Sequence, residues 1–194
     1  MINSLIIKVK GFLMNPGETF RQTRDDDPYV LLTYFCALLM LNVILSALIE
    51  TIFGIGNMQL RTGLLSGAAI PVMIITMVMV CSLILTLFLA AWIHLWVYIF
   101  GGRKGIMQTF KAILYGDTPF LLLGWIPLIG NLFALWSLVL GILGICELQE
   151  LSIGKAILAV AAAIITILIP LALLIAWLMS SNMVFLPVPF SWAG

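Results

Sequence analysis

Charged residues are scarce in this sequence. They make up only 9% of the 194 residues, whereas hydrophobic residues make up 63%. A soluble domain carries roughly a quarter charged residues, so this composition excludes a soluble globular fold. The formal net charge is only +1, which gives no electrostatic basis for binding nucleic acid or an acidic substrate.

Metal-binding and nucleophilic residues are also few. The three cysteines, Cys36, Cys81 and Cys146, are odd in number and far apart, which fits neither a disulfide framework nor a metal site. The single histidine, His94, has no second histidine at ligand spacing. Because the sequence also pairs no nucleophile with a base, we expect no metal, no cofactor and no enzymatic activity.

Long apolar runs are what the sequence does contain. The strands of an outer-membrane barrel alternate apolar and polar residues, whereas these runs are apolar on every face. Membrane helices need about 20 apolar residues and satisfy their own backbone polar groups. We therefore predict an all-α, polytopic integral membrane protein with five transmembrane helices, at 29–53, 70–100, 105–125, 131–147 and 154–179.

The distribution of Lys and Arg predicts the orientation. Of the nine Lys and Arg residues, only Arg61 falls on one side of the predicted membrane, and the others fall on the opposite side. Positive residues are enriched in cytoplasmic loops. We therefore predict a cytoplasmic N-terminus and, with five spans, a C-terminus outside a cell membrane that the chain crosses several times.

Two segments flank the predicted helices. In residues 4–14, Leu5, Val9 and Phe12 share one helical face and Lys8 lies on another, which predicts a short amphipathic helix at the lipid headgroups. A frayed tail is the alternative. The chain is thus divided into a cytoplasmic N-terminal segment, a five-helix membrane domain and an apolar extracytoplasmic tail, at 1–28, 29–179 and 180–194.

Polar groups inside a span are candidate functional residues, because they are costly in hydrocarbon. Asn42, Ser46 and Glu50 recur every four residues on one face of the first span. The pattern is typical of a helix–helix interface joined by side-chain hydrogen bonds. A path for a solute is the alternative.

His94 lies near the cytoplasmic end of the second span, between Trp92 and Trp96. Aromatic residues there are typical of the membrane interface. The alternative is a cytoplasm-facing site that joins His94 to acidic residues of other segments, namely Asp117, Glu147 and Glu150.

Asp117 is the one charged residue in the stretch LYGDTPFLLLGWIPLIGN, residues 114–131. Pro119 removes a helical hydrogen bond, and Gly116 permits close backbone approach. An Asp two residues before a helical Pro can cap a restarted helix. We therefore predict a broken helix whose carboxylate accepts backbone hydrogen bonds, with protonation or pairing to a cation as alternatives. Pro127 and Gly130 then predict a tight turn into the fourth span.

Three stretches together resemble the Yip family of five-span membrane proteins, whose eukaryotic members are known as Rab-interacting proteins. One is KAILYGDTPFLLLGWIPLIGNLFALWSLVLGILGICELQELSIGKAILAV (111–160). It is similar to the family pattern of an aromatic and small residues before a proline, a gwiP-like turn and a glycine-containing helix. FGGRKGIMQTFKA (100–112) and FLMNPGETFRQTRDD (12–26) resemble the family's glycine-containing loop and its N-terminal entry.

The resemblance implies five helices, a cytoplasmic N-terminus and roles in vesicle trafficking and small-GTPase binding among eukaryotic members. Those members carry a long N-terminal region, whereas segment 1–28 is short. We therefore interpret the chain as the prokaryotic type and do not expect it to bind a small GTPase. The family brings no catalytic residues.

Together these observations predict a non-enzymatic scaffold that binds partners or organises the membrane. Its expected partners are the lipid bilayer and other membrane proteins or further copies of itself. The acidic run Asp25-Asp26-Asp27 is interpreted as a solvated cap on the first span rather than a docking site. The alternative function is a small solute or ion transporter or channel that uses the intramembrane polar residues, namely Asp117, His94, Asn42, Glu50 and Glu147.

Overall fold

The computed structural model describes residues 2–53 and 69–183, and these are helical with no strand among them. This confirms the predicted all-α class. The elements in chain order are α1 (Ile2–Met14), α2 (Pro16–Gln22), α3 (Pro28–Phe53), α5 (Ala69–Ile99), α6 (Ile106–Gly116), α7 (Thr118–Leu123), α8 (Gly130–Gln149) and α9 (Ile153–Met183).

Four helices of the described part are long and apolar enough to cross a membrane: Pro28–Ile49, Val72–Ile99, Gly130–Gln149 and Ile153–Ser180. They coincide with the first, second, fourth and fifth predicted spans. Their apolar side chains remain largely exposed on the chain's own surface, as expected where lipid is the solvent. Most of the predicted tail 180–194, and Arg61, lie outside the described residues.

The third predicted span is divided into two short helices, α6 of 11 residues and α7 of 6 residues. The predicted break at Asp117 is therefore present. Pro119 lies in the first turn of α7, where its missing N–H removes no helical hydrogen bond. Neither piece alone is long enough to count as a membrane span, so residues 2–53 and 69–183 contain four such helices and one broken pair.

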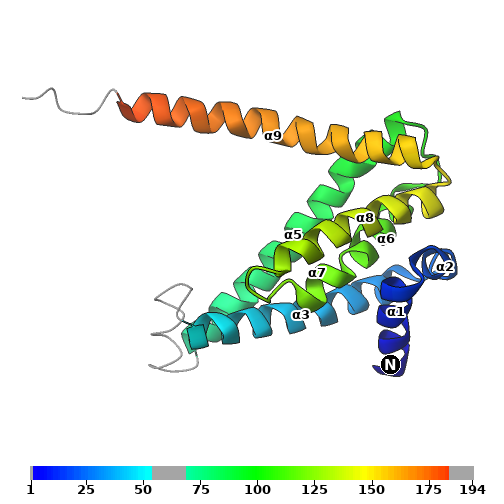
Figure 1. Ribbon diagram of the computed structural model, residues 1–194, viewed down its shortest axis with the longest axis horizontal. Helices are drawn as coiled ribbons and strands as arrows, with labels where there is room; N and C mark the ends of the chain where they lie inside the picture. The colour runs from blue at the N-terminus through cyan, green and yellow to red at the C-terminus, as the bar shows by residue number, and fades with distance from the viewer. Residues whose placement is uncertain (1, 54–68, 184–194) are drawn as a thin grey trace, which may run out of the picture.

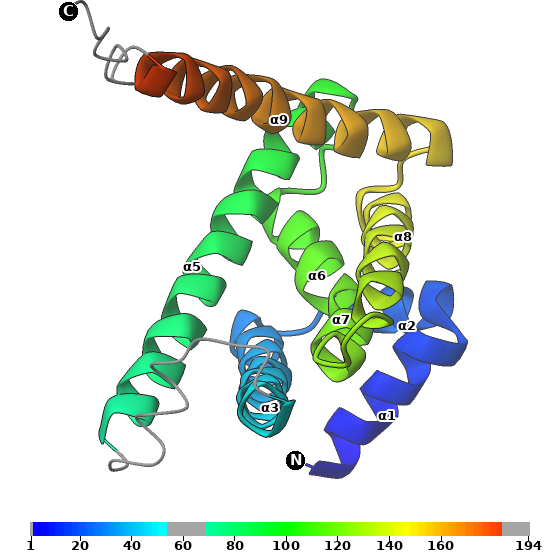
Figure 2. The same ribbon diagram turned by 60° about the vertical axis from the view of Figure 1, so that its left-hand side comes forward.

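Helix α8 packs closely against α6 (Figure 2), because small residues face each other where the two helices touch. A Cβ atom added to Gly116 would lie 2.9 Å from the Gly141 Cα, and one added to Gly144 would lie 3.0 Å from the Ala112 Cα. Real Cβ atoms essentially never show the first distance, and the second is tighter than most real Cβ contacts. The two helix backbones are therefore in contact, as glycine permits in membrane helix pairs.

The N-terminal helices pack against one end of the bundle, and α1 runs crosswise to α3 (Figure 1). Phe12 of α1 and Phe20 of α2 are fully buried there. The Phe12 ring centroid lies 4.9 Å from that of Phe20 and 5.0 Å from that of Tyr115, and Tyr34 lies 5.1 Å from Tyr115. This aromatic cluster joins α1, α2, α3 and α6 into one core.

Helix α9 packs on the rest of the molecule through its first half only. Ala156, Ala159 and Ala163 are buried against the neighbouring helices α5 and α8. From Leu171 onward the described side chains are exposed, and α9 extends away from α8 (Figure 1). The helix continues through Pro170 without interruption.

Candidate functional site

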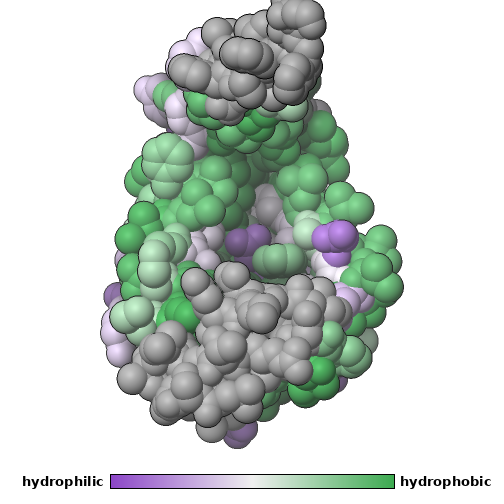
Figure 3. Space-filling view, turned by 90° about the vertical axis from the view of Figure 1, so that its left-hand side faces the viewer, coloured by the Kyte–Doolittle hydropathy of each residue, from purple (hydrophilic) through white to green (hydrophobic). Residues whose placement is uncertain are grey.

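Two cavities meet at Asp117. One, of about 530 Å³, lies between α3 and α5 and is called the α3–α5 cavity. The other, of about 280 Å³, lies between α5, α8 and α9. Both are lined by Thr86, Leu89, Asp117 and Phe120. On the face seen in the space-filling view, a hollow opens between hydrophobic walls and has hydrophilic residues at its bottom (Figure 3).

The α3–α5 cavity is lined mainly by apolar side chains, and its polar side chains besides Asp117 come in two helical pairs. Asn42 and Ser46 are four residues apart on α3, and Ser82 and Thr86 are four residues apart on α5. This spacing places each pair on one face of its helix. Asn42 Nδ2 donates a 3.1 Å hydrogen bond to the Phe120 carbonyl, which is the interhelical bond that the interface interpretation predicts.

Sequence reasoning selected Asn42 and Ser46 and missed Ser82 and Thr86. The missed pair carried the same signal, a spacing of four residues along one helix. Hydroxyl groups inside a membrane helix can bond their own backbone, so that signal is weak. Among the described residues, Ser46, Ser82 and Thr86 have no side-chain hydrogen-bond partner.

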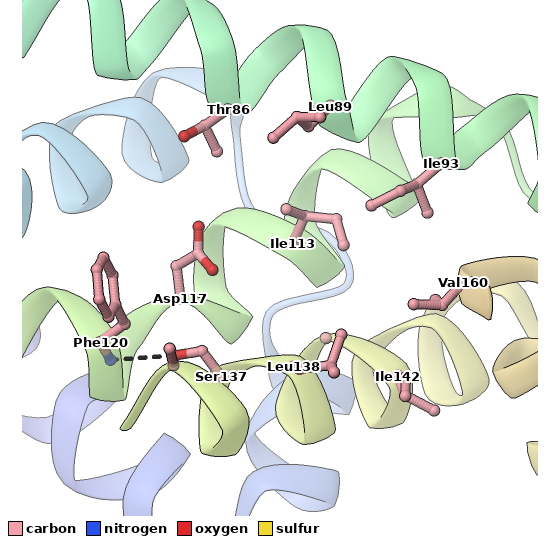
Figure 4. A pocket seen from close by; sticks show the side chains of 12 residues that line it. Thr86, Leu89, Ile93, Ile113, Asp117, Phe120, Ser137, Leu138, Ile142 and Val160 are labelled. Atoms are coloured by element: carbon pink, nitrogen blue, oxygen red, sulfur yellow. Dashed lines mark hydrogen bonds between the residues drawn. The ribbon is translucent and has the colours of Figure 1, made fainter. Parts of the chain in front are cut away.

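Asp117 stands between α6 and α7, and its carboxylate points toward Thr86 of α5 (Figure 4). The expectation that this carboxylate caps α7 is wrong, because no side-chain capping bond forms. Among the described residues, none donates a hydrogen bond to it. The carboxylate is therefore an unpaired group in the wall of both cavities.

The reason that Asp117 does not cap α7 lies in the two amides that a capping residue would reach. An N-cap side chain accepts from the second or third helical N–H. The second residue here is Pro119, which has no N–H, and the N–H of the third, Phe120, donates to Ser137 Oγ of α8 at 3.0 Å. The Thr118 hydroxyl has partners of its own, because it donates to the Tyr115 carbonyl at 2.6 Å and lies 2.9 Å from the Tyr34 hydroxyl.

His94 lies in a separate polar network at the other end of α5. Its Nδ1 is 2.8 Å from the Thr109 hydroxyl, and Gln149 Nε2 donates to the same hydroxyl at 2.9 Å. Thr109 and Gln149 are buried. The network thus joins α5, α6 and α8, which is a structural role. For the alternative of one shared site, the described contacts do not join His94, Asp117, Glu147 and Glu150 to one another. His94 lies against Thr109, Asp117 lines the two cavities, and the two glutamates bond Arg21 and Arg24.

Glu147 and Glu150 belong to an ion-pair cluster with Arg21, Arg24 and Lys104. Arg21 Nε bonds Glu147 Oε2 at 2.8 Å, and Glu150 binds Arg24 at 2.8 Å and Lys104 at 2.6 Å. The hydrogen bonds from Lys104 and Arg24 lower the pKa of the Glu150 carboxyl. The bond to Glu147 raises the pKa of the Arg21 guanidinium. The cluster ties α2 to the end of α8 and to the loop before α6.

The acidic run behaves as a cap and an anchor. Asp27 Oδ1 accepts a 2.7 Å hydrogen bond from the Tyr29 N–H at the start of α3. Asp26 forms an ion pair with Lys8 of α1 and accepts a 2.5 Å hydrogen bond from the Tyr115 hydroxyl. Asp25 is exposed. The structure therefore favours the cap interpretation over a docking site.

The remaining candidate, Glu50, lies near the end of α3, and its side chain lies outside the described part of the chain. Among the described residues, no group of three or more His, Cys, Asp and Glu side chains gathers at one point. The α3–α5 cavity can therefore offer one carboxylate, one amide and three hydroxyls, which suits a proton or a single positive group.

The fold and the cavities define a helical membrane protein with polar groups inside an apolar bundle. The model of the Yip1 domain family matches residues 10–186, and the chain therefore belongs to this family, as its sequence motifs predicted. No curated protein and no solved structure matches the chain significantly.

Proposed function

We propose that the chain is a five-span protein of the cell membrane with a cytoplasmic N-terminus, an outside C-terminus and a non-enzymatic role as a membrane-organising scaffold. Its partners in this role are the lipid bilayer and other membrane proteins or further copies of itself. The family is not known as enzymatic. The proposal includes the division of the chain at residues 28 and 179 into an N-terminal segment, a membrane domain and a C-terminal tail.

The ion-pair cluster supports five crossings. Lys104, just before α6, binds Glu150, just after α8, so α6 starts at the end where α8 stops. The stretch from Ile106 to Leu123 would cover roughly 27 Å at 1.5 Å per residue, which is close to the thickness of the hydrocarbon core. If α8 crosses the membrane, the α6–α7 pair beside it crosses in the opposite direction.

The observation that carries the scaffold role is the position of α1. It lies crosswise to α3, held by Phe12 in the aromatic cluster and by the Lys8–Asp26 ion pair. Ile6 and Ile7 are 55% and 70% exposed on its free side. Phe12 of the predicted apolar face instead packs into the protein, and the exposed side of the helix carries Ile6, Ile7 and Lys10. Exposed apolar residues beside a lysine suit a position among the lipid headgroups.

The first test reports where α1 lies. Ile7→Cys carries a fluorophore in full-length protein whose three native cysteines are replaced by alanine, reconstituted in vesicles with lipids brominated near the headgroup. We expect strong quenching at this position. Gln22→Cys, on the exposed side of α2, is the matched control and should remain unquenched. Equal weak quenching at both positions would contradict the interfacial helix.

The second test addresses the scaffold role itself. The protein is purified in mild detergent and compared with the Ile6→Ser/Ile7→Ser variant, with Gln22→Ser as control. A scaffold should co-purify reproducibly with the same membrane protein or with further copies of itself, and loss of the apolar face of α1 should weaken this. Recovery of the wild-type chain without any partner or self-association would count against the scaffold.

A second candidate function is transport of a small cationic solute, and the unpaired Asp117 carboxylate favours it. Liposomes that contain the wild type should then show flux that Asp117→Asn abolishes. Asp25→Asn is the control, because Asp25 is exposed and lines neither of these two cavities. Flux that persists in Asp117→Asn would remove this candidate.

A further inference from the structure

We propose that the α3–α5 cavity is a binding site for one monovalent organic cation with apolar substituents, and that Asp117 is its counter-charge. The proposal goes beyond the scaffold role. It names a ligand class for the cavity that the transport candidate would use, but it concerns binding at equilibrium and does not require transport.

The residues that line the cavities favour a positively charged ligand. Asp117 is the only titratable side chain among the described residues that line either cavity. It has no hydrogen-bond donor within the described part of the chain. An unpaired carboxylate in a low-dielectric site is unfavourable. A cationic group placed beside it would supply the missing partner, whereas an anionic ligand would be repelled.

The lining of the α3–α5 cavity offers too few oxygen ligands and charges for a multivalent metal ion. Hard divalent cations take six or more oxygen ligands, usually with several carboxylates. The described lining offers one carboxylate together with the amide of Asn42 and the hydroxyls of Ser46, Ser82 and Thr86. The Asn42 amide also donates to the Phe120 carbonyl, which restricts its orientation. One negative charge matches one positive charge.

The lining of the α3–α5 cavity does not suit a phospholipid headgroup either. An ammonium lipid such as phosphatidylethanolamine carries a phosphate next to its amine. The phosphate would need a cation or several donors, and no Lys or Arg side chain of the described residues lines the α3–α5 cavity. Lys8, Arg21, Arg24 and Lys104 form ion pairs at the end of the bundle. A cation without an adjacent anion fits better.

The size of the cavity and its apolar walls favour an organic cation. A cavity of about 530 Å³ is within the usual size for small-molecule sites, which combine apolar walls with a few polar groups. Leu39, Val43, Ile75, Val78, Leu85 and Leu89 supply most of that apolar wall. A strongly hydrated inorganic ion would lose its water against such walls, whereas an organic cation brings its own apolar surface.

Because a carboxylate binds either a proton or a cation, the ligand must compete with protons. No second titratable group from α3, α5, α7 or α8 faces Asp117 among the described residues. Ligand affinity should therefore fall as the pH is lowered, and this dependence should follow one group. The Asp117→Asn variant should lose it.

The test measures equilibrium binding of radiolabelled tetraphenylphosphonium to the purified full-length protein in detergent. We expect one saturable site per chain. Asp117→Asn should weaken binding by about 30-fold or more, since removing one partner of a buried charge pair costs 2 kcal/mol or more. Asp25→Asn should bind as the wild type does, and Asp117→Glu should retain part of the affinity.

Competitors define the ligand class. Phenyltrimethylammonium should displace the probe, whereas tert-butylbenzene, its neutral analogue of the same shape, should not. Displacement by millimolar Na⁺ or K⁺ at equal ionic strength would overturn the proposal in favour of an inorganic cation site. Unchanged binding in Asp117→Asn, with the variant eluting as a single folded species, would also overturn it. Saturable binding without vesicle flux would support this inference and remove the transport candidate.

Discussion

The N–H group of Phe120 donates its hydrogen bond to the hydroxyl of Ser137, across 3.0 Å and from one helix to another. This bond uses the amide that Asp117 would otherwise cap. A side chain of α8 therefore leaves a carboxylate of the α6–α7 break available to the cavities. The availability of Asp117 is a tertiary effect.

Replacing Ser137 tests this relationship. In Ser137→Ala the Phe120 amide loses its acceptor, and the Asp117 carboxylate is the nearest group in the sequence that can replace it. We expect tetraphenylphosphonium affinity to fall and the stability of the fold to change by only about 1 kcal/mol, the usual worth of one hydrogen bond. Equilibrium binding and thermal unfolding in detergent measure the two effects.

Ser82→Ala is the matched control for Ser137→Ala, because it removes a hydroxyl from the cavity wall without freeing a backbone amide. It should weaken binding less than Ser137→Ala does. If both variants bind the probe as tightly as the wild type does, the bond between α7 and α8 has no influence on Asp117.

The contact between α6 and α8 predicts a second set of effects. In Gly116→Ala the new Cβ would lie 2.9 Å from the Gly141 backbone, so the helices must separate. Such overpacking typically costs 1–3 kcal/mol, and we expect a lower midpoint of thermal unfolding. In the control, Gly154→Ala, the added Cβ meets nothing within 4 Å. The idea fails if both alanine variants unfold at the wild-type temperature.

The main helices could be predicted from the sequence because length and apolar composition suffice to define a membrane span. The break at Asp117 was also predictable, since proline favours the first turn of a new helix. The state of the carboxylate was not, because it depends on Ser137, which comes from a different helix. The same holds for His94, whose partner Thr109 is contributed by α6. Contacts between distant residues decide what a polar side chain does.

Acidification should loosen the N-terminal segment. Lys104 and Arg24 lower the pKa of Glu150 below its ordinary value of 4.5. A lowered pKa in the folded state stabilises the fold above the unfolded pKa, and this stabilisation is lost as the pH falls through the folded value. The protection of residues 16–24 against hydrogen exchange, corrected for the intrinsic exchange rate at each pH, should therefore fall between about pH 5 and 3. Molar salt should reduce the effect, because the pairs are exposed.

Glu150→Gln isolates this contribution, because it removes the charge that Arg24 and Lys104 bind and leaves the other carboxylates in place. The variant should show less protection of residues 16–24 against exchange at neutral pH, and it should lose less of that protection on acidification. If the wild type and Glu150→Gln give parallel pH profiles, the ion pairs of Glu150 do not hold the segment.

The two ends of α8 give a direct test of the five crossings. Leu128, 94% exposed in the turn before α8, and Ser152, exposed in the turn after it, are each replaced by cysteine in a chain whose native cysteines are alanine. A membrane-impermeant maleimide applied to intact cells should label Leu128→Cys only, because Ser152 lies on the side of the Lys104–Glu150 pair. Both should react after the cells are opened. A re-entrant hairpin of α6, α7 and α8 in a three-span chain would instead leave both positions unlabelled until the cells are opened, and this result would show that α8 does not cross.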